Sequence, residues 1–444
     1  MSSNRPPTSR PWYNKRTRDG TAHRVEESTT PSPPPPLGDV LRTLQMGDLA
    51  GQAREFADTA KIRHVQIVTS YNWVDNKASE PTILVPGKPP LWTPQTVPSR
   101  LKEDNGSYFR DKNAARYPKH PMEPAVIASL NSDAAIPAKV DMVACGSTLG
   151  NLLRFVRGQD KPFRILAYKV RDTVFLVRRE NSPTELIPGV RGFGHTFPET
   201  NTTWESDVRG SASHQRVVRY TFGGMRLLVR FEADGYIDEK NPPVPGSAPV
   251  AKPPSVDVDD LASSFAGNTI SPSPASPPPD TALKIISTTG PVIPQSSVFD
   301  LKTRSIYTRS KKDHLADELP RLWVTQIPTF ILAFHTQGLF AKQDIEIKDV
   351  REEVKRWEEE HSAKLEKLAA LLSWIKELVG SGEVGGKVEI CYRGQDAGVL
   401  EARRQLADAG EVLSDGMRKR WERGAAMASE EEELEGLVAE GGKS

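Results

Sequence analysis

The chain has 444 residues, and its hydrophobic content of 37% and charged content of 26% allow a sizeable core beneath a polar surface. The formal net charge is +1, which excludes a nucleic-acid binder by overall charge and requires any basic surface to be local. Only two cysteines occur, Cys145 and Cys391, so a disulfide scaffold and a cysteine-rich zinc site are excluded. There is no apolar run long enough for a membrane span and no signal-peptide core. We therefore expect a soluble protein of the nucleus, the cytoplasm or both.

Composition divides the chain into one folded part and three low-complexity parts. Residues 1–56 are predicted to form a disordered N-terminal region, because Pro, Ser, Thr and Arg dominate most of it. Residues 57–425 are predicted to form one large domain, interrupted by a disordered Pro/Ser-rich insertion at 241–279. Residues 426–444 are predicted to be an acidic, disordered tail.

Apolar periodicity and turn residues predict the elements of this domain. A short amphipathic stretch at Val40–Phe56 comes before the domain. In the first half of the domain, the elements are a strand at Val65–Val68, a strand end at Met142–Gly146, a helix at Thr148–Arg157, a hairpin of Phe163–Ala167 with Thr173–Val177, and a hairpin of Arg216–Phe222 with Arg226–Asp234. In the second half, they are a strand at Val298–Thr303, a helix from about Pro320, a strand at Phe330–Phe334, a helix at Lys348–Val379, a strand at Val388–Tyr392 and a last helix at Val399–Arg423. The mixture predicts an α+β fold with a mixed β-sheet core flanked by helices.

Two acidic motifs lie at the ends of apolar strands. Side chains two residues apart on a strand point to the same face, so Glu232 pairs with Asp234, and Asp300 pairs with Lys302. Carboxylates that face inward are costly unless a cation or a hydrogen-bond donor satisfies them. Mg²⁺ prefers oxygen ligands and can activate water for phosphodiester hydrolysis. The motifs therefore favour a joint metal site; the alternative for either motif alone is an exposed strand face.

Four short motifs occur in one order along the chain: Gly194-His195-Thr196-Phe197-Pro198-Glu199, Glu232-Ala233-Asp234-Gly235, Asp300-Leu301-Lys302-Thr303 and Trp323-Val324-Thr325-Gln326. This set resembles the decapping exoribonuclease (DXO/Rai-type) family, over residues 62–395. The resemblance implies a PD-(D/E)XK nuclease-like fold.

The resemblance also implies roles for individual residues. The implied ligands of a divalent metal, Mg²⁺ or Mn²⁺, are Glu199, Asp234 and Asp300. Glu232 would act through a metal-bound water, Lys302 would orient the attacking water, and Gln326 would support the scissile phosphate. The implied function is metal-dependent hydrolysis of RNA 5′ ends, by decapping, pyrophosphohydrolysis and 5′–3′ digestion. The alternative is a catalytically weakened relative that binds RNA or serves as a scaffold for a 5′–3′ exoribonuclease partner.

The sequence departs from the family pattern at three places. Glu199 comes one residue later than the family glutamate, after Pro198, and Asp300 replaces a glutamate. Cys145 stands where the family has a phosphate-contacting arginine, and Arg154 or Arg157 follows close enough to compensate. These departures point to a shifted substrate or a reduced activity.

Basic residues near the acidic motifs are candidates for RNA phosphate contacts. Arg216 lies on the hairpin strand before Glu232, and Arg304 and Arg309 follow the strand that carries Asp300. A solvated strand face is the alternative for Arg216. The chain contains neither a G-x-S-x-G elbow nor a Walker-type phosphate loop, so a serine hydrolase triad and a P-loop nucleotidase have no support.

Overall fold

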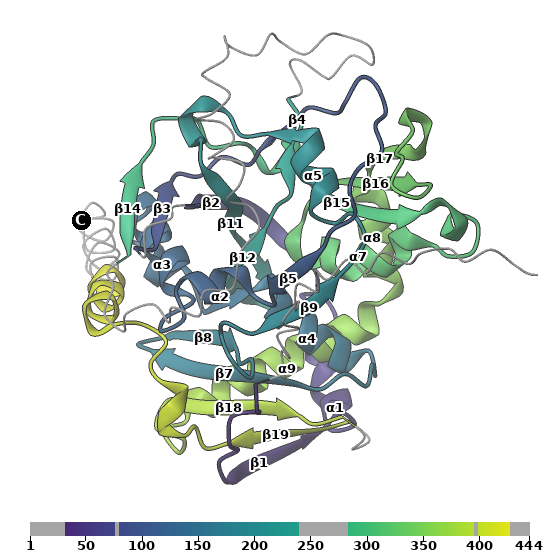
Figure 1. Ribbon diagram of the computed structural model, residues 1–444. Coiled ribbons are helices and arrows are strands. Elements are labelled where there is room, and N and C mark those ends of the chain that lie inside the picture. The colour runs from purple at the N-terminus through teal and green to yellow at the C-terminus, as the bar shows by residue number, and fades with distance from the viewer. Residues whose placement is uncertain (1–31, 76–79, 239–282, 395–397, 427–444) are drawn as a thin grey trace, which may run out of the picture. The chain divides into compact units, whose positions relative to one another are not determined.

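The computed structural model describes residues 32–75, 80–238, 283–394 and 398–426 (Figure 1). These residues belong to one compact unit, as the sequence predicts. The predicted insertion at 241–279 and residues 427–444 of the predicted acidic tail lie outside the described residues, as do residues 1–31. Within the described ranges, no helix is both long and apolar enough to span a membrane.

A large mixed sheet forms the centre of the fold. Its strands, in spatial order, are β1 (Val40–Gln45), β19 (Val399–Arg403), β18 (Lys387–Tyr392), β7 (Phe163–Val170), β8 (Thr173–Arg178), β6 (Met142–Cys145), β12 (Met225–Glu232), β11 (Ser211–Phe222), β2 (Arg63–Val74), β3 (Thr82–Val85) and β14 (Lys284–Ser287). The central strand β6 runs parallel to both β8 and β12, whereas the two predicted hairpins, β7–β8 and β11–β12, are antiparallel and confirmed.

Apolar side chains alternate between the two faces of this sheet. Leu227 and Val229 of β12 pack into one core cluster, and Leu228 packs into another. The first cluster is covered by α4 (Gly146–Val156), α7 (His314–Thr325) and α9 (Ser362–Gly380). The second cluster is covered by α3 (Glu123–Ser132) and by a helix over residues 415–426. Both faces of the central strands are therefore buried, which explains their nearly continuous apolar sequences.

A second sheet lies beyond the end of β12. Its strands, in spatial order, are β10 (Thr202–Thr203), β4 (Leu91–Trp92), β13 (Gly235–Tyr236), β15 (Val298–Ser305), β16 (Thr329–His335) and β17 (Ile345–Asp349). The chain passes directly from β12 of the first sheet to β13 of the second, across Ala233 and Asp234. Two more strands, β5 (Gly106–Phe109) and β9 (Leu186–Val190), pair with each other beside α2 (Lys112–Arg116).

The N-terminal boundary of the folded part is earlier than the sequence predicts. β1 pairs antiparallel with β19, and α1 (Leu49–Ala53) follows it. Leu44 and Leu49 are buried in the core. The predicted disorder of residues 40–56 is therefore wrong, because these two leucines anchor an otherwise polar segment against the sheet.

Two predicted helices are also wrong in part. The predicted helix at Lys348–Val379 is divided into α8 (Arg351–Glu360) and α9, with a break at His361. The predicted last helix begins instead with the strand β19, in which buried and half-buried side chains alternate with a period of two. Its helical part is confined to residues 415–426.

Candidate functional site

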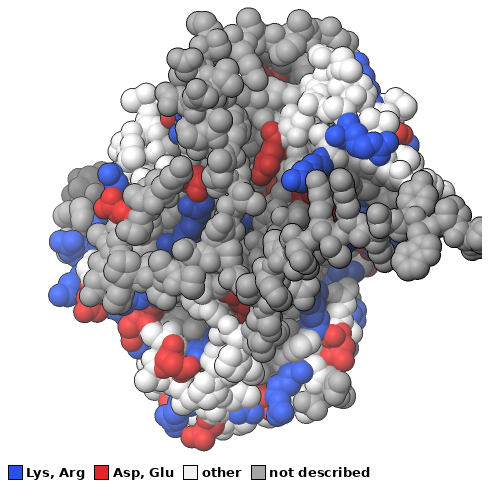
Figure 2. Space-filling view, viewed as in Figure 1, with Lys and Arg blue, Asp and Glu red and all other residues white. Residues whose placement is uncertain are grey.

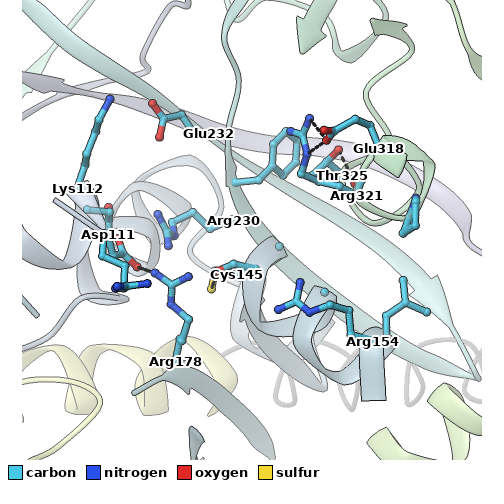
Figure 3. A pocket seen from close by; sticks show the side chains of 18 of the residues that line it. Asp111, Lys112, Cys145, Arg154, Arg178, Arg230, Glu232, Glu318, Arg321 and Thr325 are labelled. Atoms are coloured by element: carbon cyan, nitrogen blue, oxygen red, sulfur yellow. Dashed lines mark hydrogen bonds and ion pairs between the residues drawn. The ribbon is translucent and has the colours of Figure 1, made fainter. Parts of the chain in front are cut away.

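The site is built at the carboxyl ends of the parallel strands β6 and β12. Cys145 ends β6, and Arg230 and Glu232 lie at the end of β12 on the same side, two residues apart. Gln215 of the neighbouring strand β11 lies opposite Glu232 in the strand pairing. These four side chains line one pocket. Figure 3 labels three of them, Cys145, Arg230 and Glu232.

The pocket has a volume of about 650 Å³ and a predominantly basic lining. Seven cationic side chains contribute to it: Arg110, Lys112, Arg154, Arg157, Arg178, Arg230 and Arg321. Four anionic side chains contribute to it: Asp111, Glu232, Asp317 and Glu318. Since three of the four carboxylates already form ion pairs, with Arg178, Lys312 and Arg321 respectively, the pocket has an excess of positive charge.

Arg230 is the most deeply placed of these cations. Only 8% of the residue is exposed, and its Nη1 donates to Oε1 of Gln215 at 2.8 Å. Its buried Nε has no hydrogen-bond acceptor in the described part of the chain. Burial works to lower the pKa of Arg230, but Tyr71, Cys145 and Asp111, in that order, raise it above the usual value. The guanidinium is thus held charged, with one donor left for a ligand.

Arg154 and Arg178 also line the pocket. Arg178 is held by Asp111 at 3.0 Å, and Asp111 also caps α2 by accepting from Ala114 N at 2.9 Å. The buried Nε of Arg154 finds no acceptor among the described residues, although Nη2 donates to Asn151. Burial first, and then repulsion from Arg178, lowers the pKa of Arg154. An anion placed between these guanidinium groups would relieve that repulsion.

Cys145 lies at the N-terminus of α4, in the floor of the pocket. Its Sγ is 2.9 Å from Oγ1 of Thr148 and 3.2 Å from Oγ of Ser147. Burial works to raise the pKa of the thiol, but Arg230 and these hydroxyl groups lower it below the usual value. Although the family arginine is absent at this position, Arg154 and Arg157 both line the pocket, as a compensating arginine should.

Glu232 and Lys112 lie at the rim of the pocket (Figure 3). Glu232 is exposed to solvent, yet partial desolvation within the pocket raises the pKa of its carboxyl. Lys112 opposes that shift, and Asp234 adds to it. Of the predicted catalytic residues, Glu232 is therefore the one that faces the pocket.

Asp300 and Lys302 share one face of β15, as the D-x-K spacing predicts. Nζ of Lys302 lies 3.7 Å from Oδ1 of Asp300. Asp300 is only 1% exposed, and both of its oxygens accept from Arg321 of α7. Arg321 in turn pairs with Glu318, one helical turn earlier, at 2.9 Å. Asp300 is thus enclosed behind Arg321 and does not line the pocket itself.

The predicted metal ligands do not gather around one point. Oδ2 of Asp234 accepts from Leu301 N at 2.7 Å, at the passage between the two sheets. Glu199 is exposed on α5 (Thr196–Asn201), where desolvation and Asp104 raise the pKa of its carboxyl. Within the part of the chain that the structure describes, no three His, Cys, Asp or Glu side chains are placed to hold a metal ion. With Asp300 saturated by Arg321, the predicted carboxylate set does not fit a preformed metal centre.

Gln326 is placed away from the pocket. It ends α7 in the left-handed conformation, with a φ of 53°. Its side-chain amide donates to the carbonyl oxygen of Trp323, and its own carbonyl oxygen accepts from Nε2 of Gln295 at 3.0 Å. The predicted phosphate contact of Gln326 is therefore not supported by its position, because the side chain caps its own helix. Thr325 and Gln215 line the pocket instead.

The three arginines predicted to bind RNA are all outside the pocket lining. Arg216 is completely buried, because alternation along β11 turns it to the face opposite Gln215. There it donates to Oε1 of Gln295 at 2.9 Å, and burial lowers its pKa to about 9. Arg304 pairs with Glu318 at 3.3 Å, and Arg309 pairs with Asp344 and Glu346. The prediction for Arg216 is wrong, and the other two arginines are engaged within the protein.

Sequence reasoning missed most of the basic lining, above all Arg321, Arg178 and Lys112. Arg230, by contrast, can be found from the sequence, because it lies two residues before Glu232 and a strand directs both side chains to the same side. The sequence gives a weaker indication for Arg321, which lies two residues before Trp323. Its spacing of three residues from Glu318 predicts an ion pair on one face of a helix. Arg178 and Lys112 come from segments distant in the sequence, and only the fold brings them together.

Comparison with known structures defines the class of this fold. The chain is similar to Rai1 of Scheffersomyces stipitis, solved in complex with (3'-NADP)+ and calcium ion, at 11% identity, a TM-score of 0.51, and coverage of 86% of this chain and 100% of that chain. It is also similar to Candida albicans Rai1, solved in complex with pU5-Mn2+ (10% identity, TM-score 0.48, coverage 83% and 98%). A third similar structure is K. lactis Dxo1 in complex with manganese (9% identity, TM-score 0.43, coverage 84% and 95%). The expected DXO/Rai-type fold is confirmed.

A family comparison places the sequence more narrowly. Residues 55–401 match the family described as Domain of unknown function (DUF8563), and the chain belongs to that family. No curated protein matches the sequence significantly.

Proposed function

We propose that the basic pocket binds the phosphorylated 5′ end of an RNA. The observation that carries the proposal is Arg230, a residue that is only 8% exposed and whose charged guanidinium group keeps its Nε without an acceptor among the described residues. A buried charged donor is costly unless a ligand or a partner satisfies it, and guanidinium groups match phosphate oxygens in geometry. Arg154 offers a second free donor on the other side of the same pocket.

The fold supports an RNA ligand over a small free anion. The S. stipitis Rai1 structure with this fold holds (3'-NADP)+, a ligand with nucleosides as well as phosphates. A pocket of about 650 Å³ also has room for more than one phosphate group. Its rim carries Phe109, whose ring offers an apolar surface beside the cations.

The test compares one short RNA in two forms, with a 5′ monophosphate and with a 5′ hydroxyl, by fluorescence polarisation. We expect the phosphorylated form to bind at least about tenfold more tightly, since a charge-assisted hydrogen bond contributes about 1.5–3 kcal/mol. Arg230→Met should remove this preference. Arg351→Gln is the matched control, because Arg351 is an exposed arginine of α8 that pairs with Asp349 and lies outside the pocket. Equal affinity of the two RNA forms for the wild-type protein would refute the proposal.

Metal-dependent hydrolysis of the bound 5′ end is the second candidate function. Glu232 and Asp234 favour it, because desolvation first, and then the nearby Asp234 carboxylate, raise the pKa of Glu232, as expected of carboxylates that lie near one another in a pocket. The test is release of product from 5′-triphosphate and unmethylated-cap RNA in Mg²⁺ or Mn²⁺. Wild-type protein should release product and the double variant Asp234→Ala, Lys302→Ala should not; identical behaviour of the two proteins rules out the hydrolase. A 5′–3′ exoribonuclease partner stays a prediction of the sequence.

A further inference from the structure

The Asp300 carboxylate needs a positive partner. It is 1% exposed and is the third residue of β15, between the apolar residues Phe299 and Leu301, both of which are buried. A charged carboxylate at such a position is stable only if cations or hydrogen-bond donors satisfy its oxygens. In a metal-dependent site of the kind that the sequence predicts, a divalent ion would have this role.

Arg321 supplies that positive charge from the protein itself. Its Nη1 and Nη2 donate to the two oxygens of Asp300, so that the pair is bidentate. Lys302 adds a second positive charge 3.7 Å from Oδ1. A divalent ion that used the two lone pairs bonded to Arg321 would have to displace the guanidinium group.

The position of Arg321 is fixed by its own helix. Nε of Arg321 donates to Oε2 of Glu318 at 3.0 Å, and Oε1 of Glu318 accepts from Arg304 at 3.3 Å. Figure 3 shows Arg321 and Glu318 together on the wall of the pocket, on the same side as Thr325. The Arg321 side chain is 38% exposed, so the guanidinium that holds Asp300 also faces the pocket.

We propose that Arg321 takes the place of a divalent cation beside Asp300, and that the pocket binds its 5′-phosphorylated RNA without metal. This inference rests on the proposed function and concerns how the same site neutralises its ligand. Arg321 couples the two requirements: it balances the buried carboxylate, and it presents positive charge to a phosphate in the pocket. A divalent ion beside Asp300 would meet two fixed positive charges and a carboxylate whose oxygens are already bonded.

The first test needs no variant. The affinity of the wild-type protein for a 5′-monophosphorylated RNA is measured in EDTA and in Mn²⁺ at constant ionic strength. We expect the two dissociation constants to agree within about twofold, because the cations that contact the phosphate belong to the protein. In parallel, the electron paramagnetic resonance signal of free Mn²⁺ should be unchanged when the protein is added at equal concentration.

The second test removes the guanidinium group. Arg321→Gln should weaken RNA binding in EDTA about tenfold, and Arg321→Lys, which keeps the charge without the bidentate geometry, should lie between it and wild type. Circular dichroism establishes that each variant is folded, and Arg351→Gln is the control that should bind as wild type does. RNA binding that is tenfold tighter in Mn²⁺, depletion of the free Mn²⁺ signal by wild type, or full affinity of folded Arg321→Gln would overturn the inference. Absence of any 5′-phosphate preference under both conditions would instead refute the proposed function.

Discussion

The two ends of the parallel strands β6 and β12 differ in how their charged groups are satisfied. At the starting end, Asp141 accepts from the backbone N of Arg226 at 2.8 Å, from its Nε at 3.0 Å and from Nζ of Lys376 at 3.2 Å. At the carboxyl end, Arg230 and Arg154 each keep a buried donor without an acceptor in the described residues. The same two strands thus begin in a closed ion-pair network and end in an open one.

This difference separates a structural role from a recognition role. The network around Asp141 joins the start of β12 to α9, and its hydrogen bonds are complete without a ligand. The network around Arg230 leaves its buried Nε without an acceptor in the described residues, and an anion in the pocket would supply one. The ends of parallel strands at which the helices begin are common places for ligands, since helix N-termini and strand ends meet there. Here α4 begins directly after β6, at the floor of the pocket.

The largest effect is expected from removal of the deepest cation. Arg230→Met should weaken binding of 5′-phosphorylated RNA about 100-fold, because a buried charge-assisted hydrogen bond to phosphate contributes about 2–3 kcal/mol. Titration by fluorescence polarisation measures the change. If a folded Arg230→Met protein bound the RNA as tightly as wild type, the carboxyl ends of the two strands would have no recognition role.

A substitution at the starting end of β6 and β12 should change the stability of the protein and not its affinity for RNA. Interactions with Arg226 and Lys376 outweigh the opposing effect of burial and lower the pKa of Asp141 to about 2. Asp141→Asn should therefore lower the free energy of unfolding by about 2 kcal/mol at pH 7 and leave RNA affinity unchanged. Urea denaturation of both proteins measures this difference.

The pH dependence of the unfolding free energies of wild type and Asp141→Asn tests the same explanation further. Because the folded pKa is lower than the unfolded value of about 4, the stabilisation from Asp141 is complete above that value and is lost as the pH falls toward about 2. The difference in unfolding free energy between wild type and Asp141→Asn should shrink over that range. A difference that persists at pH 2 would show that the ionised carboxylate is not its source.

A smaller effect on binding is expected at the far wall of the pocket. Arg154 is half-buried and is repelled by Arg178, so a ligand phosphate should gain less from it than from Arg230. Arg154→Gln should weaken binding of 5′-phosphorylated RNA about tenfold. Binding as tight as that of wild type would confine the site to the Arg230 side of the pocket.

The smallest effect is expected from an arginine that the sequence assigned to RNA. Arg309 pairs with Asp344 at 3.1 Å and lies over the ring of Phe334. Arg309→Gln should change RNA affinity by less than about twofold and should cost at most about 1 kcal/mol of stability, as is usual for a partly exposed ion pair. A loss of RNA affinity as large as that of Arg230→Met would move the binding surface to this region.

The sequence predicted the central elements well where local patterns are strong. The Gly223-Gly224 hairpin and the same-face placement of Asp300 and Lys302 follow from local geometry, and both are present. The fold class follows from the four ordered motifs. Local patterns do not show which groups satisfy a buried charge, however, and so the partner of Asp300 was expected to be a metal ion although it is Arg321.

The errors in the candidate site have one common physical cause. The type of a residue indicates its chemistry, but the tertiary fold decides the side to which the side chain points. Arg216 is one residue away from Gln215, and that single step directs it into the core and not into the pocket. Gln326 lies at a helix end, where its amide satisfies a carbonyl of the last turn.

A crystal structure of the protein with a short RNA that carries a 5′ phosphorothioate tests the central claim most directly, because anomalous scattering from sulfur locates the terminal phosphate. The account predicts the terminal phosphate within hydrogen-bond distance of the Arg230 guanidinium, between β12 and α4. A bound RNA whose terminal phosphate lies outside this pocket, for example against Arg304 and Arg309, would contradict it.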